Sequence, residues 1–552
     1  MNNFKILIRI SLALIVSIGL LPAQLCPEDT CDVTPGYETL NLAVEGDTTA
    51  AGEPANLNRV YRLARGGAYL LNGSVEGLSG VHLRVVAEAG AGPRPLIIPA
   101  VDVSGFASRA FRPNDDGTFK GLYITGRDDL GNFTSDMKNM FRLEKDDGRY
   151  VVDNCFLDYE FQSLFRMNAD NIKLFITNSI LRNCYEPADA SDSKMIDTRG
   201  NPQDTILVQN NTLYAGSGRI IRSDKTEIYD LIFDHNTVVQ FGDRLEVEKV
   251  VNATITNNLF LDINHFGTIY DAADPADTMW AEVIDLDSLD APAIAAEEDR
   301  QIVISHNSFA WSPELTAWYT ANGVVQHPVP LHQPGLFMIA TFPNMVYENN
   351  IAEFPAFSDP LPLDSLLAFM QHGYDTDYSD IGNPLIYHDR NGIGSYYDLP
   401  GSVGPAADEF DFDYADTEAA YGHGIDGFPL GDLNWFPDLK AIWDAGGTIG
   451  TDNDSQTLPT QFSLEQNYPN PFNPTTSITY QLHASAAVKL TIFNILGQNV
   501  RTLVNEAIQS TGEYMVQWNG LNDAGIPVVS GLYIYQLESE NNLQTKKMLL
   551  IK

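Results

Sequence analysis

Arginines recur at nearly regular intervals in the first half of the sequence, and their side chains could bind an acidic polymer. Arg142, Arg166, Arg199, Arg222 and Arg244 follow one another at intervals of 24, 33, 23 and 22 residues. A guanidinium group binds a carboxylate or a sulfate through two parallel hydrogen bonds. Because the chain has a formal net charge of −40, a series of cations on this acidic background requires an explanation.

Two sources of negative charge could balance these arginines. In "AFRPNDDG", "MFRLEKDDG" and "LFRMNADN", Arg112, Arg142 and Arg166 have apolar neighbours, which predicts strands with the arginine pointing outward. Stacked cations about 4.8 Å apart repel each other by about 1 kcal/mol in water, so a column of them needs anions. Either nearby carboxylates such as Asp115 and Asp146 supply them, or a ligand with one acidic group per sugar does.

The longest interval in the arginine series contains an acidic loop, "YEPADASDSK" (Tyr185–Lys194). Long loops that rise from a repeat structure often form the wall of a binding site. Glu186, Asp189 and Asp192 carry the hard oxygen ligands that calcium prefers, although their spacing matches no strict calcium-loop motif. We predict either a calcium site or a solvated acidic loop.

The arginine intervals follow a second repeat, in which an asparagine ends a short apolar segment, as in "FITNSIL" and "ITNNLFL". The asparagines of this series are Asn154, Asn178, Asn211, Asn236, Asn258, Asn307 and Asn350. Asparagine tolerates the left-handed backbone conformation of turns, and stacked asparagines can bond to one another. The repeat predicts an all-β fold, a right-handed parallel β-helix with one arginine per coil.

These repeats resemble the coils of the pectate-lyase-like β-helix superfamily over roughly residues 55–355. Some of its members cleave acidic polysaccharides by β-elimination, with Lys or Arg as the base and with calcium or arginine neutralising the uronate carboxylate. The resemblance implies Arg199 or Lys194 as the catalytic base. It also implies that Arg142, Arg166, Arg222 and Arg244 bind the substrate. The sequence shows no convincing set of aspartates for a hydrolase.

The segments after the repeats differ in composition. Residues 355–444 are rich in loops and aromatic side chains, and "LDSLLAFMQHGY" predicts a helix. We interpret this region as a cap over the open end of the β-helix. Residues 445–460 have the composition of a linker.

The last part of the chain carries the most specific motif. "FSLEQNYPNPFNPTTSITYQL" and the alternating segments that follow predict a small immunoglobulin-like β-sandwich. Residues 461–552 closely resemble the C-terminal type A sorting domain of the type IX secretion system. The resemblance implies that the type IX machinery is a partner of this domain. It also implies that the protein is secreted from a Gram-negative bacterium or held on its outer-membrane surface.

The beginning of the chain is consistent with export. Residues 1–24 have a basic start, an apolar stretch and a cleavage region, as in a signal peptide. Export permits disulfides, so Cys26 and Cys31 could close a small loop, whereas Cys155 and Cys184 occupy repeat positions where burial alone would explain them. No later segment is apolar for long enough to cross a membrane, and the acidic surface excludes nucleic acid as a general partner.

The sequence therefore predicts a signal peptide (1–24), a β-helix domain (25–354), a loop-rich cap (355–444), a linker (445–460) and a sorting domain (461–552). The predicted function is binding, with or without eliminative cleavage, of an acidic polysaccharide along the outward arginines. Calcium is the only cofactor considered. The alternative is a non-catalytic adhesion or structural protein of the cell surface, whose arginines are neutralised internally.

Overall fold

The computed structural model divides the chain into two compact units, Met1–Trp443 and Asp444–Lys552. Within the described residues, no helix is long and apolar enough to span a membrane. The structure describes residues 28–99, 109–127, 138–160, 162–184, 193–223, 226–265, 282–289, 297–324, 327–331, 333–375, 410–449, 463–464, 466–482, 486–494, 498–509, 512–539 and 542–551.

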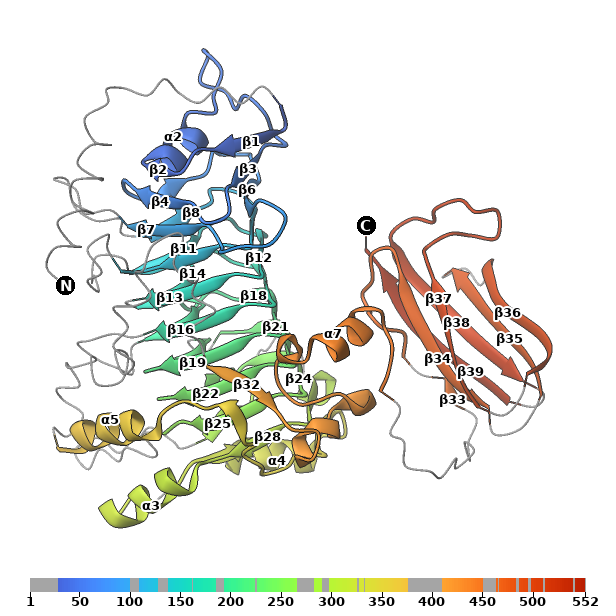
Figure 1. The fold of residues 1–552 in the computed structure, drawn as a ribbon. Helices are drawn as coiled ribbons and strands as arrows, with labels where there is room; N and C mark the ends of the chain where they lie inside the picture. Colours follow the sequence, from blue (N-terminus) through green and yellow to red (C-terminus); the bar gives the residue numbers. More distant parts are fainter. Residues whose placement is uncertain are drawn as a thin grey trace, which may run out of the picture. The chain divides into compact units, whose positions relative to one another are not determined.

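Three parallel sheets form the walls of a β-helix in the first unit, and successive coils add one strand to each sheet (Figure 1). The eleven-stranded sheet contains, in order, β1 (Thr30–Val33), β3 (Val60–Leu63), β6 (Leu83–Ala87), β9 (Gly117–Lys120), β12 (Arg149–Asp153), β15 (Lys173–Thr177), β18 (Gln203–Gln209), β21 (Ile228–Asp234), β24 (Val250–Thr256), β27 (Gln301–Ser305) and β30 (Met345–Glu348). The ten-stranded sheet contains β2 (Gly36–Tyr37), β4 (Ala68–Leu71), β7 (Leu96–Pro99), β10 (Tyr123–Thr125), β13 (Phe156–Glu160), β16 (Ile180–Cys184), β19 (Thr212–Gly216), β22 (Thr237–Phe241), β25 (Leu259–Ile263) and β28 (Ser308–Ala310). The nine-stranded sheet contains β5 (Val75–Glu76), β8 (Arg109–Arg112), β11 (Asn139–Leu143), β14 (Ser163–Met167), β17 (Lys194–Asp197), β20 (Arg219–Arg222), β23 (Leu245–Glu246), β26 (Glu282–Asp285) and β29 (Val329–Leu331). This architecture confirms the predicted fold class.

The alternation of side chains along each strand builds the core inside the coils. In β15, Leu174 and Ile176 are fully buried, whereas the residues between and beside them are partly exposed. Phe141 stacks on Phe111 and Phe165 of the neighbouring coils, with ring centroids 5.7 and 5.0 Å apart. Columns of apolar side chains of this kind hold successive coils in register.

Helices cover both ends of this core. Helix α2 (Thr39–Glu45) packs on the first coils, where Leu40 and Val44 join the core cluster (Figure 1). Helix α4 (Gln333–Thr341) contacts β30 at the other end, where Met338 is buried in the same cluster. The ends are therefore closed by apolar side chains and not by exposed strand edges.

A buried ladder of asparagines runs along the turns between the eleven-stranded and ten-stranded sheets. Each Nδ2 donates a hydrogen bond to the Oδ1 of the next asparagine, at distances of 3.1, 3.0, 2.9 and 3.0 Å. The ladder consists of Asn211, Asn236, Asn258, Asn307 and Asn350. This stacking was predicted from the repeat, and these bonds confirm it for five of the seven asparagines.

The other two asparagines occupy a different column, so the predicted alignment is wrong by one residue. Asn154 and Asn178 both have φ of 52°, and their structural equivalent is Asn210 with φ of 53°, because Thr177 pairs with Gln209. This column supplies the left-handed turn residue. Ser179 takes the ladder position instead, and its N–H donates to Asn211 Oδ1 at 2.9 Å.

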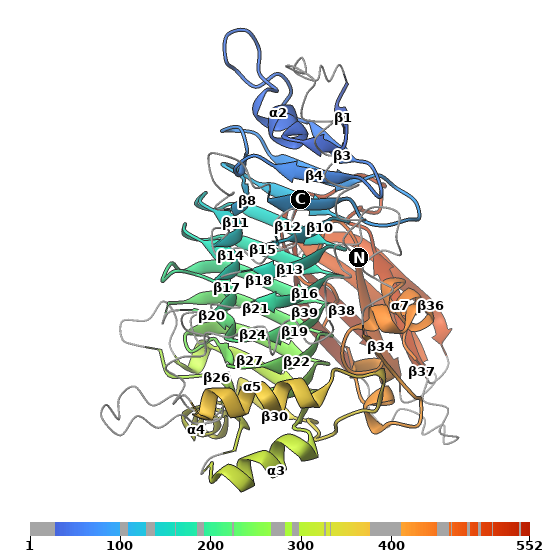
Figure 2. The same ribbon diagram turned by 60° about the vertical axis from the view of Figure 1, so that its left-hand side comes forward.

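The region predicted to cap the open end packs instead against the outer face of the ten-stranded sheet. Tyr214, Val239 and Leu261 are in register on that face and form a second apolar cluster with Leu366 and Phe412. Three apolar side chains in a column on an outer face are stabilised when other residues bury them, which explains why this region packs on that face. Its elements are β31 (Phe357–Asp359), α5 (Leu363–Asp375), β32 (Asp411–Tyr414), η6 (Ala419–Gly422), η7 (Ile425–Gly427), η8 (Leu433–Trp435) and α7 (Pro437–Asp444). The helix predicted at residues 363–374 is confirmed as α5. Helix α3 (Pro313–Asn322) packs on α5 (Figure 2). The short helix η3 (Glu297–Asp299) precedes β27.

The second unit is a sandwich of two antiparallel sheets. One sheet contains β33 (Ser463–Leu464), β34 (Thr476–Leu482) and β37 (Gly512–Trp518), and the other contains β36 (Asn499–Gln509), β35 (Ala486–Asn494), β38 (Gly531–Ser539) and β39 (Asn542–Leu550). The "NYPNPFNP" motif fixes one edge. Asn467 Nδ2 donates to the carbonyl of Pro469 at 3.1 Å, Asn470 Oδ1 accepts from the Leu549 N–H at 2.7 Å, and Phe472 packs on Trp518.

The cysteines match their predicted roles where they are described. Cys31 is disulfide-bonded, and Cys26, with which we predicted a loop, lies outside the described residues. Cys155 and Cys184 are buried, as their repeat positions indicated, and both are free. Burial raises the pKa of the Cys155 thiol to about 11 and that of Cys184 to about 12.

Candidate binding site

The predicted arginine column lies on the outer face of the nine-stranded sheet. Phe111, Phe141 and Phe165 point into the core, so the residue that follows each of them points outward. We call the register that contains these residues the outer column. From β5 to β26 it consists of Glu76, Arg112, Arg142, Arg166, Asp197, Arg222, Glu246 and Asp285.

Two of the predicted arginines are not in this column. Asp197 pairs with Arg166 on one side and Arg222 on the other, so Arg199 lies two residues past the column at the end of β17. Glu246 pairs with Arg222, so Arg244 lies two residues before it. The predicted uninterrupted column of six arginines is therefore wrong. The turns differ in length from coil to coil, and intervals between arginines alone do not give the register.

The first coils carry the basic part of the column, which we call the basic half: Arg112, Arg142 and Arg166. Glu144 links the first two, because its carboxylate pairs with Arg112 and lies 2.5 Å from Arg142 Nε. Arg112 also lies 3.4 Å from Glu76. Protein carboxylates therefore neutralise part of the basic half.

Arg166 differs from its neighbours because its described hydrogen bonds go to neutral amides. Its Nε and Nη1 donate to Asn168 Oδ1 and Gln162 Oε1, each at 3.4 Å. The side chain is half-buried. Burial, followed by the nearby Arg199, lowers the pKa of Arg166, and Asp197 acts in the opposite direction. A half-buried guanidinium with such weak partners can accept an anionic ligand.

The later coils carry the acidic part of the sheet face, which we call the acidic half: Asp243, Glu246, Glu282 and Asp285. Two arginines pair with it. Arg219 Nε lies 2.7 Å from Glu246, and Arg244 lies 2.9 Å from Asp285 and 3.1 Å from Asp243. Arg222 lies beside Glu246 in the outer column, so among the described residues four carboxylates stand against three arginines in this part of the face.

Glu282 shows how strongly charge is crowded there. Its Oε2 is buried and has no hydrogen-bond partner among the described residues, and Oε1 lies 3.6 Å from Arg244 Nε. Burial, followed by repulsion from Asp285, raises the pKa of Glu282 to about 7. The acidic half is therefore close to taking up a proton at neutral pH.

The structure describes only some of the residues that were predicted to be catalytic or to bind calcium. Lys194, on β17, is 1% exposed. Arg199 has a more exposed side chain, and its Nη1 lies 3.6 Å from Asp197 Oδ2. Glu186, Asp189 and Asp192 lie outside the described residues, so the calcium site stays a prediction. Among the residues that are described, no group of three or more His, Cys, Asp or Glu side chains could hold a metal ion.

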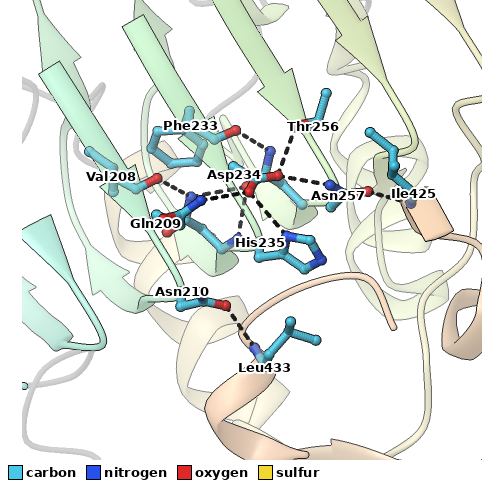
Figure 3. Close-up of polar contacts among 12 residues, drawn as sticks. Val208, Gln209, Asn210, Phe233, Asp234, His235, Thr256, Asn257, Ile425 and Leu433 are labelled. Atoms are coloured by element: carbon cyan, nitrogen blue, oxygen red, sulfur yellow. Dashed lines mark hydrogen bonds and ion pairs between the residues drawn. The ribbon is translucent and has the colours of Figure 1, made fainter. Parts of the chain in front are cut away.

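A buried polar cluster that sequence analysis missed surrounds Asp234, the last residue of β21 (Figure 3). Gln209, Thr256 and Asn257 donate to its carboxylate at 2.9, 2.8 and 2.8 Å, and His235 Nδ1 lies 3.2 Å away. Burial alone would raise the pKa of Asp234, but His235, Gln209 and Asn257 lower it to about 2. The sequence signal was the histidine in "FDHNTVV", at a repeat position that asparagine holds in several coils and His306 holds in another.

This cluster lies beneath the segment 423–436, which is bonded to the same column of turns. Asn257 Oδ1 accepts from the Ile425 N–H at 2.8 Å, and Asn210 Oδ1 accepts from the Leu433 N–H at 3.4 Å (Figure 3). The His235 ring packs edge-on against Phe428, with centroids 6.4 Å apart. We interpret this arrangement as structural, because it fixes the 423–436 segment to the coils.

The family comparison concerns the second unit. Residues 469–542 match the model of the FlgD Ig-like domain, which agrees with the observed sandwich. No curated protein matches the sequence.

Two solved structures from Porphyromonas gingivalis show partial similarity. One is PorZ, described as an essential bacterial surface component of the type-IX secretion system, at 20% identity over 19% of this chain and 13% of that chain, with a TM-score of 0.13. The other is dimeric latent PorU, at 18% identity over 16% of this chain and 9% of that chain, with a TM-score of 0.15. These scores are too low for either similarity to bear on function.

Proposed function

We propose that this chain is an exported β-helix protein that binds a polysaccharide carrying carboxylate or sulfate groups, through the basic half of the outer column. Arg166 is the observation that carries the proposal. It is half-buried, it has only amide partners at 3.4 Å among its described hydrogen bonds, and burial, followed by neighbouring arginines, lowers its pKa. A carboxylate or sulfate would supply the missing charge and two strong hydrogen bonds.

The proposal does not extend to cleavage. Lys194 is almost completely buried, so a substrate cannot reach its amine, and Arg199 Nη1 lies 3.6 Å from Asp197 Oδ2. A general base must come within hydrogen-bond reach of the proton that it removes, which burial prevents for Lys194 and for which Arg199 would have to leave Asp197. Calcium enters only through Glu186, Asp189 and Asp192, as a bridge between the protein and the acidic sugars.

The export route is part of the same proposal. The N-terminal signal and the motif-bearing C-terminal sandwich support passage to the cell surface through the type IX secretion machinery, which would recognise the second unit. The β-helix would then be exposed on the outer-membrane surface or released. Fusing residues 461–552 to a periplasmic reporter in a type IX-competent bacterium tests this part, because the reporter should reach the surface only with the domain attached.

A second candidate is supported by the ion pairs themselves. Arg112 and Arg142 share Glu144, and Arg244 lies against Asp243 and Asp285. Internal neutralisation of this kind is what a non-catalytic structural or adhesive surface protein would need. The two candidates differ in whether Arg166 meets a ligand.

Calorimetric titration with oligogalacturonate, oligoalginate and a sulfated glycosaminoglycan oligomer distinguishes them. Arg166→Gln should weaken binding at least tenfold, because a hydrogen bond to a charged group contributes about 1.5–3 kcal/mol. Arg62→Gln is the matched control, since Arg62 is an exposed arginine paired with Asp32 on the eleven-stranded sheet. Failure of the wild-type chain to bind any of the three polymers, with and without calcium, would reject the proposal. Release of unsaturated uronate in the same mixtures would add cleavage to it.

A further inference from the structure

The charge of the outer column changes sign four times along the β-helix. Glu76 precedes the three arginines of the basic half, and Asp197 follows them one coil after Arg166. Beyond Asp197 there is one further arginine, Arg222, and then the column ends in carboxylates. The run of consecutive arginines therefore spans only three coils, β8, β11 and β14, with a carboxylate at each end.

The carboxylate that ends the run is fixed in place. Asp197 is 1% exposed, and its Oδ1 accepts a hydrogen bond from the Arg199 N–H at 3.1 Å. It cannot swing away from a ligand as an exposed side chain would. Further along the sheet, Asp243 and Glu282 are also buried, beside Glu246 and Asp285.

An anionic chain lying along this face would meet attraction and then repulsion. Coils are about 4.8 Å apart, so Arg112 and Arg166 lie about 10 Å from each other along the axis of the β-helix. A sugar in an extended polysaccharide advances by about one coil spacing, which matches one acidic group to each arginine. The next acidic group in line would face Asp197, and later ones would face the acidic half.

We propose that this surface recognises the terminal two or three acidic sugars of a polysaccharide, and not a long internal stretch. The inference rests on the proposed function, since it takes the basic half as the ligand site. A chain end satisfies the three arginines and stops before Asp197. An internal segment of the polysaccharide continues beyond the basic half, so it must pass a carboxylate at one end of the arginine run or at both ends.

The length dependence of binding tests this directly. Oligogalacturonates from dimer to decamer are titrated into the full chain by calorimetry, at equal concentration of molecules. Affinity should rise from dimer to trimer and then stay within about twofold up to decamer. In addition, the number of sites counted on long polygalacturonate should follow the number of chain ends and not the mass of polymer.

Asp197→Asn removes the proposed stop while keeping the shape of the side chain. It should let a longer oligomer continue past this coil toward Arg222, which already lies in the same register, so that affinity continues to rise through tetramer and pentamer, by about fivefold relative to wild type. Asp230→Asn, which removes an exposed carboxylate from the eleven-stranded sheet, is the matched control and should leave the length profile unchanged.

The outcomes separate the two claims. If no oligomer of any length binds wild-type protein, the proposed function fails and this inference fails with it. If wild-type affinity keeps rising steadily to the decamer, or if sites scale with polymer mass, the site is an extended track; the proposed function then survives and this inference is wrong. The wild-type length series decides the matter even if Asp197→Asn does not fold.

Discussion

The asparagine ladder makes a quantitative prediction about stability, because Asn236 lies in its fully buried middle. Its Nδ2 donates to the Val208 carbonyl at 2.8 Å and to Asn258 Oδ1 at 3.0 Å. Its Oδ1 accepts from the backbone N–H and the Nδ2 of Asn211, both at 3.1 Å. The side chain is 0% exposed, so water cannot replace these bonds.

Replacing Asn236 by alanine removes the hydrogen bonds that its side chain makes to the Val208 carbonyl and to the Asn211 N–H. The other two groups keep a bond, since Asn211 Nδ2 also donates to Ile176 O and Asn258 Oδ1 also accepts from the Asn236 N–H. A buried polar group that loses its partner costs about 1–3 kcal/mol. We therefore expect Asn236→Ala to lower the free energy of unfolding by about 4 kcal/mol.

Urea denaturation of the full chain, followed by far-ultraviolet circular dichroism, measures this loss. Asn350→Ala is the matched control, because Asn350 ends the ladder and is only half-buried, so water can take over its bonds. The control should cost about 1 kcal/mol. An Asn236→Ala loss below 1 kcal/mol, or one no larger than that of Asn350→Ala, would refute the account of the ladder.

Three further predictions concern buried ionisable groups. Burial raises the pKa of Asp432 from 3.8 to about 6. Its contribution to stability is therefore present at low pH and lost as pH rises through 6. Asp432→Asn should remove about 3 kcal/mol of the pH dependence of the unfolding free energy between pH 4 and 8, which urea midpoints would measure. Arg182 bonds to Asp158 at 2.9 Å, and both side chains are buried. Arg182→Met should therefore lower the free energy of unfolding by about 3–5 kcal/mol, because it leaves a buried charge without its partner. The double variant with Asp158→Leu should lower it much less, which a double-mutant cycle would show. The thiols of Cys155 and Cys184 should not react with a thiol reagent at pH 8 in the folded chain and should react when it is unfolded; labelling of native protein would contradict their burial.

The sequence by itself determined the fold class and much of its local detail. Apolar alternation around Phe141 and Phe165 fixed which side chains point inward, because strand geometry alone assigns successive residues to opposite faces. The recurrence of asparagine indicated both turns and a ladder, since these are properties of the residue type. The C-terminal segments predicted a sandwich because their alternating apolar residues indicate strands and the Asn, Pro and Gly residues between them suit turns.

The candidate site was predictable only in part. Arg142 and Arg166 follow one another in adjacent coils with turns of ordinary length, so the sequence aligned them correctly. Arg199 and Arg244 were misplaced by two residues, because Asp197 and Glu246 occupy the positions in the column. Intervals along the chain cannot distinguish an arginine in register from one displaced by a longer turn.

What only the tertiary structure decided is how coils align and what covers them. The register is set by contacts between coils, such as the stacked phenylalanines and the bonds from Asn211 to Asn350, which no single repeat contains. Those contacts place Asp197 between Arg166 and Arg222, and they bring the 423–436 segment onto turns about 200 residues earlier, as the bond from Leu433 to Asn210 shows. Local preferences act over a few residues, whereas the packing of successive coils acts between residues that are distant in the chain. The sign of the charge at each level of the outer column depends on this packing.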